Sequence, residues 1–425
     1  MSLRVTFSPD FEASALGQRY REALAALYER LRAVYAARNT SSAYANSDGF
    51  INAAYDDVIH EQIKACVAQK DTLSVDTLVV VGIGGSSLGT RALCELFHAK
   101  YAKKLRIIFA ESFDPVQWVQ EVGCDPQRTL VNVVSKSGNT LETVVLLERW
   151  LAVLQKQHGN RAADFIVVTT DVGSPLDTWA QKFGCAVLHI PGAVGGRWSV
   201  LSPVALFAAA MAGLSINDLC AGARLCVDEY MQDWLNHDSF LTASFVAEQL
   251  RKGNFLWDLF LFGAPLNALG LWQRQLIGES LGKRYRAPFT NNLVPTVSVG
   301  TSDLHSIVQL YLGGVIAQQT TFITIAQWES SEHCHATTQL LPMVNGKSYA
   351  QLLEILFESV CLAYEQQGKP YVHVALDCYD VQSVGYYLQM CMIQTVLLAE
   401  IVGVNAYDQP QVELYKKQAR RLLAQ

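Results

Sequence analysis

The sequence predicts an α/β protein with two tandem domains, each built on a parallel sheet covered on both faces by helices. A chain of 425 residues is too long for one hydrophobic core, and half of its residues are apolar. Short β-branched runs that end in Gly, Ser or Asp alternate with helical stretches, which is typical of parallel strands buried on both faces. This pattern occurs twice, on either side of a long apolar helix near 201–213.

The two sets of predicted strands divide the chain into its domains. The first set comprises 77–85, 105–112, 129–138, 164–171 and 185–192. The second set comprises 254–263, 293–301, 320–327 and 371–378. We therefore place the first domain at 46–215 and the second at 235–403.

Helical segments are expected at both ends of the chain. Leu24, Leu27 and Leu31 recur at three- and four-residue steps, so 1–45 is predicted to be an amphipathic helical extension. The final segment, 404–425, contains "QVELYKKQARRLLAQ" and is predicted to be a loop followed by a basic helix.

Composition limits the kinds of partner and compartment. The net charge of −6 and the pI near 5.9 argue against a nucleic-acid-binding protein, which usually has a basic face. The ten cysteines are scattered without a CxxC pair, which is typical of a reducing cytosol rather than of a disulfide framework. With no apolar secretion signal at the N-terminus, we expect a cytoplasmic protein.

Two uncharged runs, 198–217 and 381–399, are long enough to cross a membrane. The first contains Pro203, and the second contains three glutamines and is flanked by acids rather than by Lys or Arg. We expect both to be buried helices of a soluble protein, with no membrane partner.

A glycine-rich turn follows the first predicted strand, in "VVVGIGGSSLGTRAL". Gly82, Gly84 and Gly85 allow a backbone to approach closely, and the next helix offers free N–H groups to an anion. A dinucleotide fingerprint would need glycine at Ser87, and a nucleotide P-loop would need lysine at Thr90. The turn alone leaves a phosphate site and an ordinary tight turn equally open.

A second turn, in "VVSKSGNTLETVVLL", follows the third strand. Ser135, Ser137, Thr140 and Thr143 supply hydroxyls and Lys136 supplies a charge where a helix begins. One such hydroxyl could cap the helix, but four exceed what one N-cap needs. Two turns of this kind on one sheet edge predict a phosphomonoester site, with Lys136 among its substrate-binding residues.

A carboxylate and an amide share one face of the helix predicted in "QRQLIGESLGKRY". Gln275 lies one turn before Glu279, and Gly282 ends the helix. Taken alone, Glu279 could be a general base or an ordinary exposed glutamate.

Six segments together resemble a known family. "GIGGSSLG", "SKSGNTLET", "VGGRWSVLSP", "QLIGESLGK", "GTSDLHS" and "YDQPQVELYKK" occur in the order found in the glucose-6-phosphate isomerase (phosphoglucose isomerase) family, in its shorter bacterial form. They extend from Gly82 to Lys417. The resemblance implies two sugar-isomerase (SIS) domains, each a doubly wound parallel sheet, and reversible conversion of glucose 6-phosphate and fructose 6-phosphate in glycolysis and gluconeogenesis.

The resemblance also implies roles for individual residues. Phosphate and sugar binding would involve Gly85, Ser86, Ser135, Ser137, Thr140, Thr143, Gln275 and Gln409. Glu279 would be the catalytic base, Arg197 the cation that stabilises an oxyanion, and Lys416 a lysine near the ring oxygen. His305 would assist ring opening from the neighbouring subunit of a homodimer. Asn139 and Leu281 depart from the family pattern.

The implied chemistry suits these residue types. Ring opening needs a group that titrates near neutrality, such as histidine. Proton transfer between C1 and C2 needs one carboxylate, and the enediolate needs a fixed positive charge. No step requires a metal or a redox cofactor. His333, Cys334 and His335 are not expected to bind a metal, because residues at i and i+2 do not share a helix face and no second His/Cys pair follows at ligand spacing. Two alternatives stay open: an isomerase that also accepts mannose 6-phosphate, and a non-catalytic SIS protein that senses a sugar phosphate.

Overall fold

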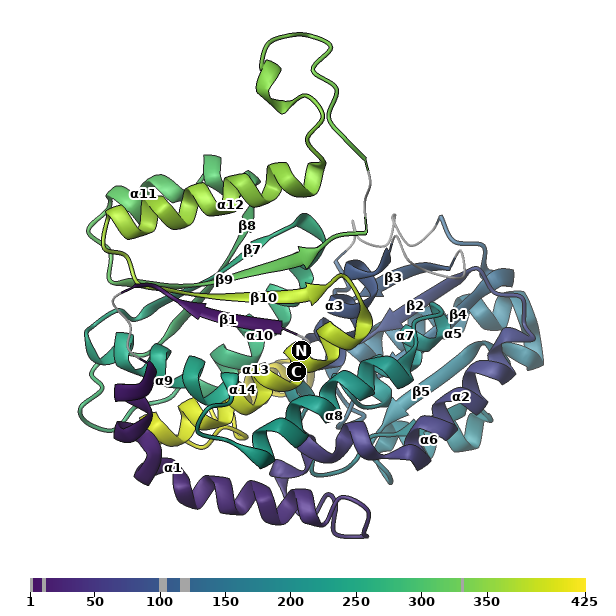
Figure 1. Cartoon of the computed structure of the whole chain (residues 1–425). Coiled ribbons are helices and arrows are strands. Elements are labelled where there is room, and N and C mark those ends of the chain that lie inside the picture. The colour runs from purple at the N-terminus through teal and green to yellow at the C-terminus, as the bar shows by residue number, and fades with distance from the viewer. Residues whose placement is uncertain (1–2, 10–12, 99–104, 115–122, 330–331) are drawn as a thin grey trace.

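The protein consists of two five-stranded sheets with helices on both faces, which confirms the predicted fold class (Figure 1). The computed structural model describes residues 3–9, 13–98, 105–114, 123–329 and 332–425, with backbone alone for 13–18. All nine predicted strands are present, and each overlaps its predicted range. The strands of the first sheet lie within 46–215, whereas the exact domain boundaries stay a prediction.

The first sheet is wholly parallel, with strand order β3-β2-β4-β5-β6. Its strands are β2 (Thr77–Val81), β3 (Arg106–Ala110), β4 (Thr129–Val134), β5 (Ile166–Thr170) and β6 (Ala186–His189). Its helices are α2 (Asp57–Asp71), α3 (Leu88–Leu96), α5 (Leu141–His158), α6 (Pro175–Phe183) and α7 (Pro203–Met211). Successive strand residues alternate between two cores: Val79 packs with the core that includes α5 and α6, and Val80 with the core that includes α3 and α7.

The second sheet has the order β1-β10-β9-β7-β8. Its strands are β7 (Leu256–Phe262), β8 (Val294–Gly300), β9 (Gln318–Gln327), β10 (Tyr371–Cys378) and β1 (Leu3–Phe7). Strand β1 runs antiparallel to β10 and was not predicted, because five residues at the N-terminus carry too short an alternation to stand out. The N-terminal segment is therefore not purely helical: its strand joins the second sheet before α1 (Ala13–Ala36) begins.

Long helices join the two halves of the molecule. They are α8 (Ile216–Gln232), α9 (Asp238–Arg251), α10 (Asn267–Leu281) and α13 (Val381–Val402). Helix α13 is long and apolar enough to cross a membrane, yet 89% of its most apolar window is buried inside the protein. Helices α8 and α13 touch so closely that a Cβ on Gly222 would lie 1.8 Å from the carbonyl oxygen of Gln382. The run 381–399 is thus a buried helix, as predicted, and the run 198–217 contains the buried helix α7 and the start of α8.

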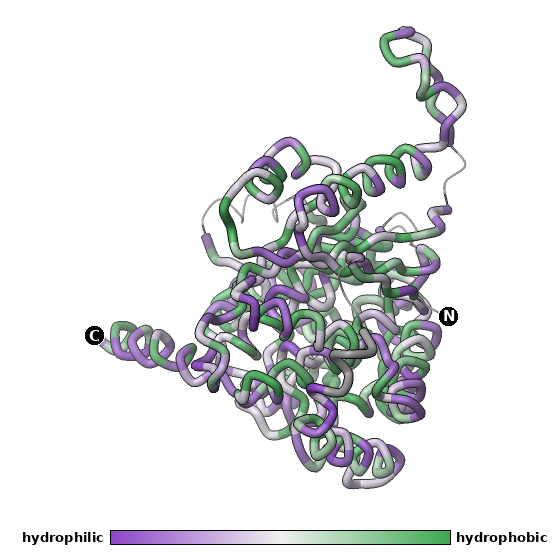
Figure 2. Tube along the Cα trace, turned by 60° about the vertical axis from the view of Figure 1, so that its left-hand side comes forward, coloured by the Kyte–Doolittle hydropathy of each residue, from purple (hydrophilic) through white to green (hydrophobic). Residues whose placement is uncertain are grey.

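Two segments project from this body. The segment 332–348 forms an arm that projects beyond the second sheet and leads into α12 (Tyr349–Gln366), which lies on the same side of the sheet as α11 (Val308–Gly313) (Figure 1). The predicted C-terminal helix is α14 (Val412–Leu423), which has no buried residue and extends away from the rest of the protein (Figure 2).

Candidate active site

The glycine turn after β2 lies against the segment that carries Arg197. A Cβ on Gly85 would lie 2.3 Å from the carbonyl carbon of Gly196 and 2.6 Å from the amide nitrogen of Arg197. Only glycine fits this contact between the short helices η2 (Gly84–Ser86) and η6 (Gly196–Trp198). The glycine turn therefore sets the position of Arg197, and half-buried Ser86 lies in the same turn.

The hydroxyl turn after β4 forms a connected group. Ser135 is buried, and its Oγ lies 3.2 Å from Thr140 Oγ1 and accepts a hydrogen bond from the backbone N–H of Gly138. Ser137 is exposed, with its Oγ 3.5 Å from Thr140 Oγ1. Within the described chain, Thr140 stands at the N-cap of α5 but its side chain makes no capping hydrogen bond. The helix-capping interpretation is therefore wrong for Thr140, and its hydroxyl stays directed to its neighbours.

Lys136 and Thr143 complete this turn in different ways. The Lys136 ammonium donates to the carbonyl oxygens of Gly192 and Val194 at 2.5 and 2.9 Å, and lies 3.5 Å from Asp171. Lys136 thus ties the turn to the segment after β6, while Thr143 is buried in the first turn of α5. This arrangement favours a supporting role for Lys136 over direct contact with a phosphate.

Arg197 is almost fully buried, with 3% of its side chain exposed. Its Nε donates to Ser280 Oγ at 2.7 Å, and its Nη2 donates to the carbonyl oxygens of Ala406 and Asp408 at 2.6 and 3.2 Å. Burial lowers the pKa of Arg197 while the nearby Glu279 carboxylate raises it, and a guanidinium keeps its charge under either influence. The side chain is therefore a fixed cation.

The remaining donor nitrogen of Arg197 connects the predicted base to the C-terminal loop. Nη1 donates to Glu279 Oε2 at 3.2 Å and to Gln409 Oε1. Since a guanidinium has five N–H donors, each of them now has a protein acceptor. A new oxygen can bind Arg197 only by replacing one of these partners.

Glu279 lies between an amide and this cation. Gln275 Nε2 donates to Glu279 Oε1 at 2.9 Å, one turn earlier on α10, and Arg197 binds the other carboxylate oxygen. The Glu279 side chain is 32% exposed, so it is held yet reachable. Gln275 Oε1 is buried with no described hydrogen-bond partner, and a Cβ on Gly84 would lie 2.9 Å from Gln275 Nε2. A buried acceptor without a donor is costly, and a sugar hydroxyl would satisfy it.

The structure does not bring His305 and Lys416 to this group. His305 is exposed at the end of η8 (Ser302–His305), directly after β8. Lys416 lies on α14, where its ammonium pairs with Glu413 at 2.9 Å. By contrast, five predicted residues form one group. They are the predicted base Glu279 together with Gly85, Arg197, Gln275 and Gln409.

Two contacting residues were missed by sequence reasoning. Ser280 is fully buried and accepts from Arg197, and Lys283 contacts both the end of α10 and the C-terminal loop. A lysine directly after the glycine that ends a helix was an available signal for the second of these.

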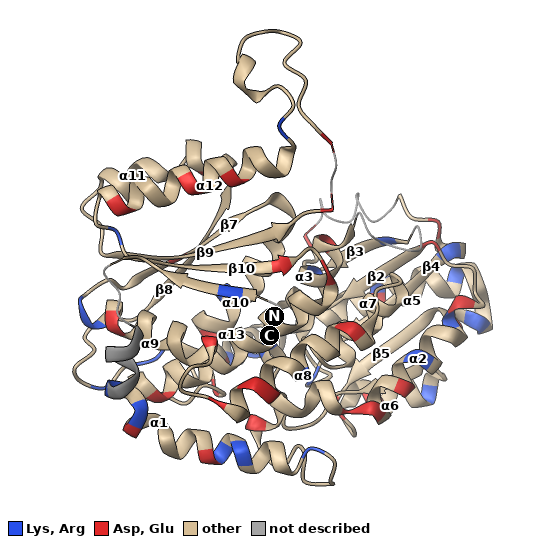
Figure 3. Ribbon diagram, viewed as in Figure 1, with Lys and Arg blue, Asp and Glu red and all other residues tan. Residues whose placement is uncertain are grey.

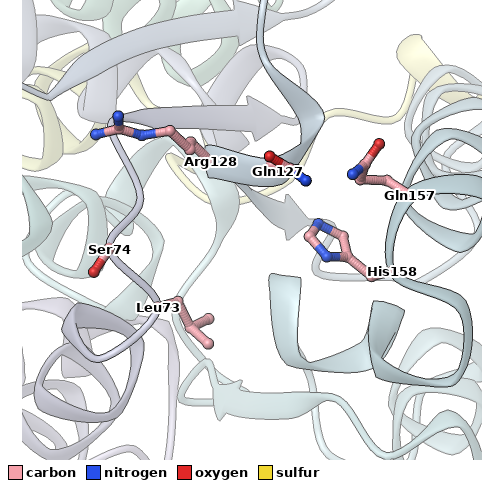
Figure 4. A pocket seen from close by; sticks show the side chains of 6 residues that line it. All are labelled: Leu73, Ser74, Gln127, Arg128, Gln157 and His158. Carbon is pink, nitrogen blue, oxygen red and sulfur yellow. The ribbon is translucent and has the colours of Figure 1, made fainter.

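Surface charges and one further pocket lie outside this group of residues. In Figure 3 basic and acidic residues are interspersed over the visible side, in line with the net charge of −6. A pocket at the amino ends of β2 and β4, opposite the glycine and hydroxyl turns, is shown in Figure 4. It is lined by Leu73, Ser74, Gln127, Arg128, Gln157 and His158. Among the described residues, no three His, Cys, Asp or Glu side chains gather as a metal site.

Comparison with known proteins identifies the family. A family model described as phosphoglucose isomerase matches residues 29–425. The chain belongs to the phosphoglucose isomerase family. A glucose-6-phosphate isomerase of Rubrobacter xylanophilus is 33% identical over 360 residues, covering 80% of each chain. One from Thermus thermophilus is 32% identical over 354 residues, covering 82% of this chain and 84% of that relative.

Solved structures with a similar fold are also found. A hypothetical protein from Thermus thermophilus superposes with a TM-score of 0.88 at 28% identity, covering 99% of this chain and 100% of that one. A glucose-6-phosphate isomerase from Chlamydia trachomatis has a TM-score of 0.86 at 20% identity, covering 100% of this chain and 88% of that one. At that lower identity the second similarity shows the fold alone.

Proposed function

We propose that this member of the phosphoglucose isomerase family interconverts D-glucose 6-phosphate and D-fructose 6-phosphate, a step of glycolysis and gluconeogenesis. The observation that carries the proposal is the Glu279 carboxylate, held between the Gln275 amide and the buried Arg197 guanidinium beside two turns suited to a phosphate. Family relatives named glucose-6-phosphate isomerase support the same activity.

The phosphate would bind at the carboxyl edge of the first sheet. The Thr140 hydroxyl lies 3.2 Å from that of Ser135 and 3.5 Å from that of Ser137. The amino end of α5 adds the positive end of a helix dipole at the same place. Hydrogen bonds to a charged phosphate are stronger than those to a neutral sugar. The glycine turn at Gly85 and Ser86 would close the other side of the phosphate.

Glu279 would carry the proton between C1 and C2. A carboxylate that removes a proton and returns it to the adjacent carbon gives a cis-enediolate intermediate, so both carbons must lie on one side of Glu279. Gln275 fits as the residue that orients the sugar, because its unpaired Oε1 can accept from a hydroxyl.

Arg197 would stabilise the enediolate. A buried cation acts strongly on a developing negative charge because little water screens it. Since all five donors of Arg197 are in use, a substrate oxygen would take the place of an existing partner. Gln409 is the side chain best suited to give way, and its amide could then bind the sugar.

The active site would be completed by a second copy of the chain, with His305 assisting ring opening across the interface and the protein forming a homodimer. His305 is exposed and is not part of the group of described residues around Glu279 in its own chain. An exposed side chain is available to reach the active site of a second chain, which supports this arrangement. Exposed apolar side chains on the arm and α12 support an interface on that side of the molecule. They are Leu340, Leu341, Met343, Tyr349, Ile355, Leu356 and Leu362.

Lys416 would act near the ring oxygen once α14 is held against the rest of the protein. Leu414, Tyr415, Leu422 and Leu423 are exposed on α14, so the helix has apolar surface available for packing.

All ten cysteines are free, which fits the expected cytoplasmic location.

A coupled assay tests the proposed function. Fructose 6-phosphate is supplied with EDTA and no added metal, and formation of glucose 6-phosphate is followed. Turnover is the expected result, and mannose 6-phosphate tested in parallel would reveal broader specificity. Saturable binding of fructose 6-phosphate without turnover would instead support the sugar-phosphate sensor.

A further inference from the structure

We propose, on the basis of the proposed function, that Lys283 is a positioning residue for the reaction. Its ammonium joins the end of helix α10, which carries Glu279, to the loop 405–408, which carries acceptors for Arg197. One partly buried cation would therefore fix the catalytic base and the oxyanion-stabilising arginine relative to each other.

The contacts of the Lys283 ammonium span two segments that are far apart in sequence. On α10 it lies 2.8 Å from the carbonyl oxygen of Ser280 and 3.2 Å from that of Glu279. On the loop it lies 2.7 Å from the carbonyl oxygen of Asn405 and 3.1 Å from the Asp408 carboxylate. Only 15% of the Lys283 side chain is exposed, so these protein oxygens replace most of its hydration.

Both segments that Lys283 contacts are stabilised by a cation at this position. The last carbonyls of a helix lack partners within the helix and carry the negative end of its dipole, so a cation stabilises them. The loop also contacts Arg197, because the backbone oxygens of Ala406 and Asp408 accept hydrogen bonds from its guanidinium. The position of the loop therefore affects the position of Arg197. Lys283 and Arg197 thus both bind the same loop.

A purely structural role for Lys283 makes a different prediction. If Lys283 only caps α10, its loss lowers stability and leaves the turnover of folded enzyme unchanged. If it positions Glu279 and Arg197, its loss lowers kcat in folded enzyme, because small displacements of reacting groups slow the chemical step. Phosphate binding, which depends on the separate turn around Ser135, should stay the same.

The chain offers a matched control in Lys70. Lys70 is buried, and its ammonium donates to the carbonyl oxygen of Asp164 at 2.7 Å. It lies on α2, outside the group of active-site residues described above. Lys70→Met removes a buried ammonium–carbonyl contact of the same kind. It reports what loss of such a contact does to stability alone.

The experiment compares Lys283→Met, Lys283→Arg and Lys70→Met with the unchanged chain. Melting temperature, kcat and KM for fructose 6-phosphate, and the inhibition constant of inorganic phosphate are measured for each. We expect Lys283→Met to lose about 10- to 100-fold in kcat with the phosphate constant unchanged within about twofold. Lys283→Arg should recover part of kcat because it keeps the charge and the donors. Lys70→Met should lower the melting temperature alone.

Wild-type kcat in folded Lys283→Met, or equal losses in kcat and in phosphate affinity, would overturn the positioning role. If Lys283→Met does not fold, Asp408→Asn replaces it, since that change weakens the same contact from the loop side and should lower kcat by less than tenfold. Unchanged kcat in folded Asp408→Asn would then overturn the proposal. An unchanged chain without isomerase activity would refute the proposed function instead, so the two failures are distinct.

Discussion

The phosphate turn of the first domain and the catalytic group around Glu279 are organised in contrasting ways. The phosphate turn is local: Ser135, Ser137 and Thr140 come from six consecutive residues and hydrogen-bond to one another. The catalytic group draws on η6, α10 and the C-terminal loop, and it leaves His305 exposed elsewhere. Binding of the phosphate therefore needs one folded segment, whereas catalysis needs distant segments and, in our proposal, a second chain.

The largest expected effect falls on the catalytic side. Glu279→Gln should abolish isomerisation while phosphate binding survives, because loss of a general base costs on the order of 10²–10⁴ in rate, and more when it carries the whole transfer. The measurement is exchange of the C2 proton of the substrate with deuterium in the solvent. Exchange that persists in Glu279→Gln would remove Glu279 from its role.

A smaller and more specific effect is expected at the phosphate turn. Ser135→Ala or Thr140→Ala should weaken fructose 6-phosphate binding by roughly tenfold to a hundredfold, because a hydrogen bond to a charged group is worth about 1.5–3 kcal/mol. Unphosphorylated fructose should hardly be affected. Thr178→Ala, which removes a hydroxyl from α6 that bonds to Ser174, is the control. Equal losses for both sugars would mean that the hydroxyls only support the fold.

A histidine of the second sheet should make the stability of the protein sensitive to acid. Burial lowers the pKa of His373 on β10 to about 4, and the ring contacts Thr324 and Phe357. The unfolded chain takes up this proton near pH 6.5, so stability is full above that pH and falls as the pH drops toward 4. From pH 7.5 to 5 the loss due to His373 should be about 1–2 kcal/mol.

Urea unfolding of His373→Gln at both pH values checks this expectation. The variant should lose less stability than the unchanged chain over the same interval, with the difference confined to the acid side. An identical loss in both proteins would show that His373 does not contribute to the acid sensitivity.

The same contrast explains what could be predicted from the sequence. Strand β4 and the hydroxyl turn after it are continuous in sequence, so their β-branched run and their serines and threonines were sufficient. The partners of Arg197 could not be predicted from spacing, because Ser280 and Ala406 come from segments that only the packing of α10 and the C-terminal loop brings together. The roles of Glu279 and His305 came from the family resemblance, and strand β1 was too short to be recognised.

The most direct test of the account asks whether the active site is shared between two chains. Glu279→Gln and His305→Ala, each inactive alone, are mixed under conditions that let subunits exchange, and isomerase activity is measured. If His305 acts across the interface, a mixed dimer has one site with both lesions and one with neither. With random pairing, roughly a quarter of the unmutated activity should return. Activity that stays at the level of the separate variants, with exchange verified, would contradict the shared site.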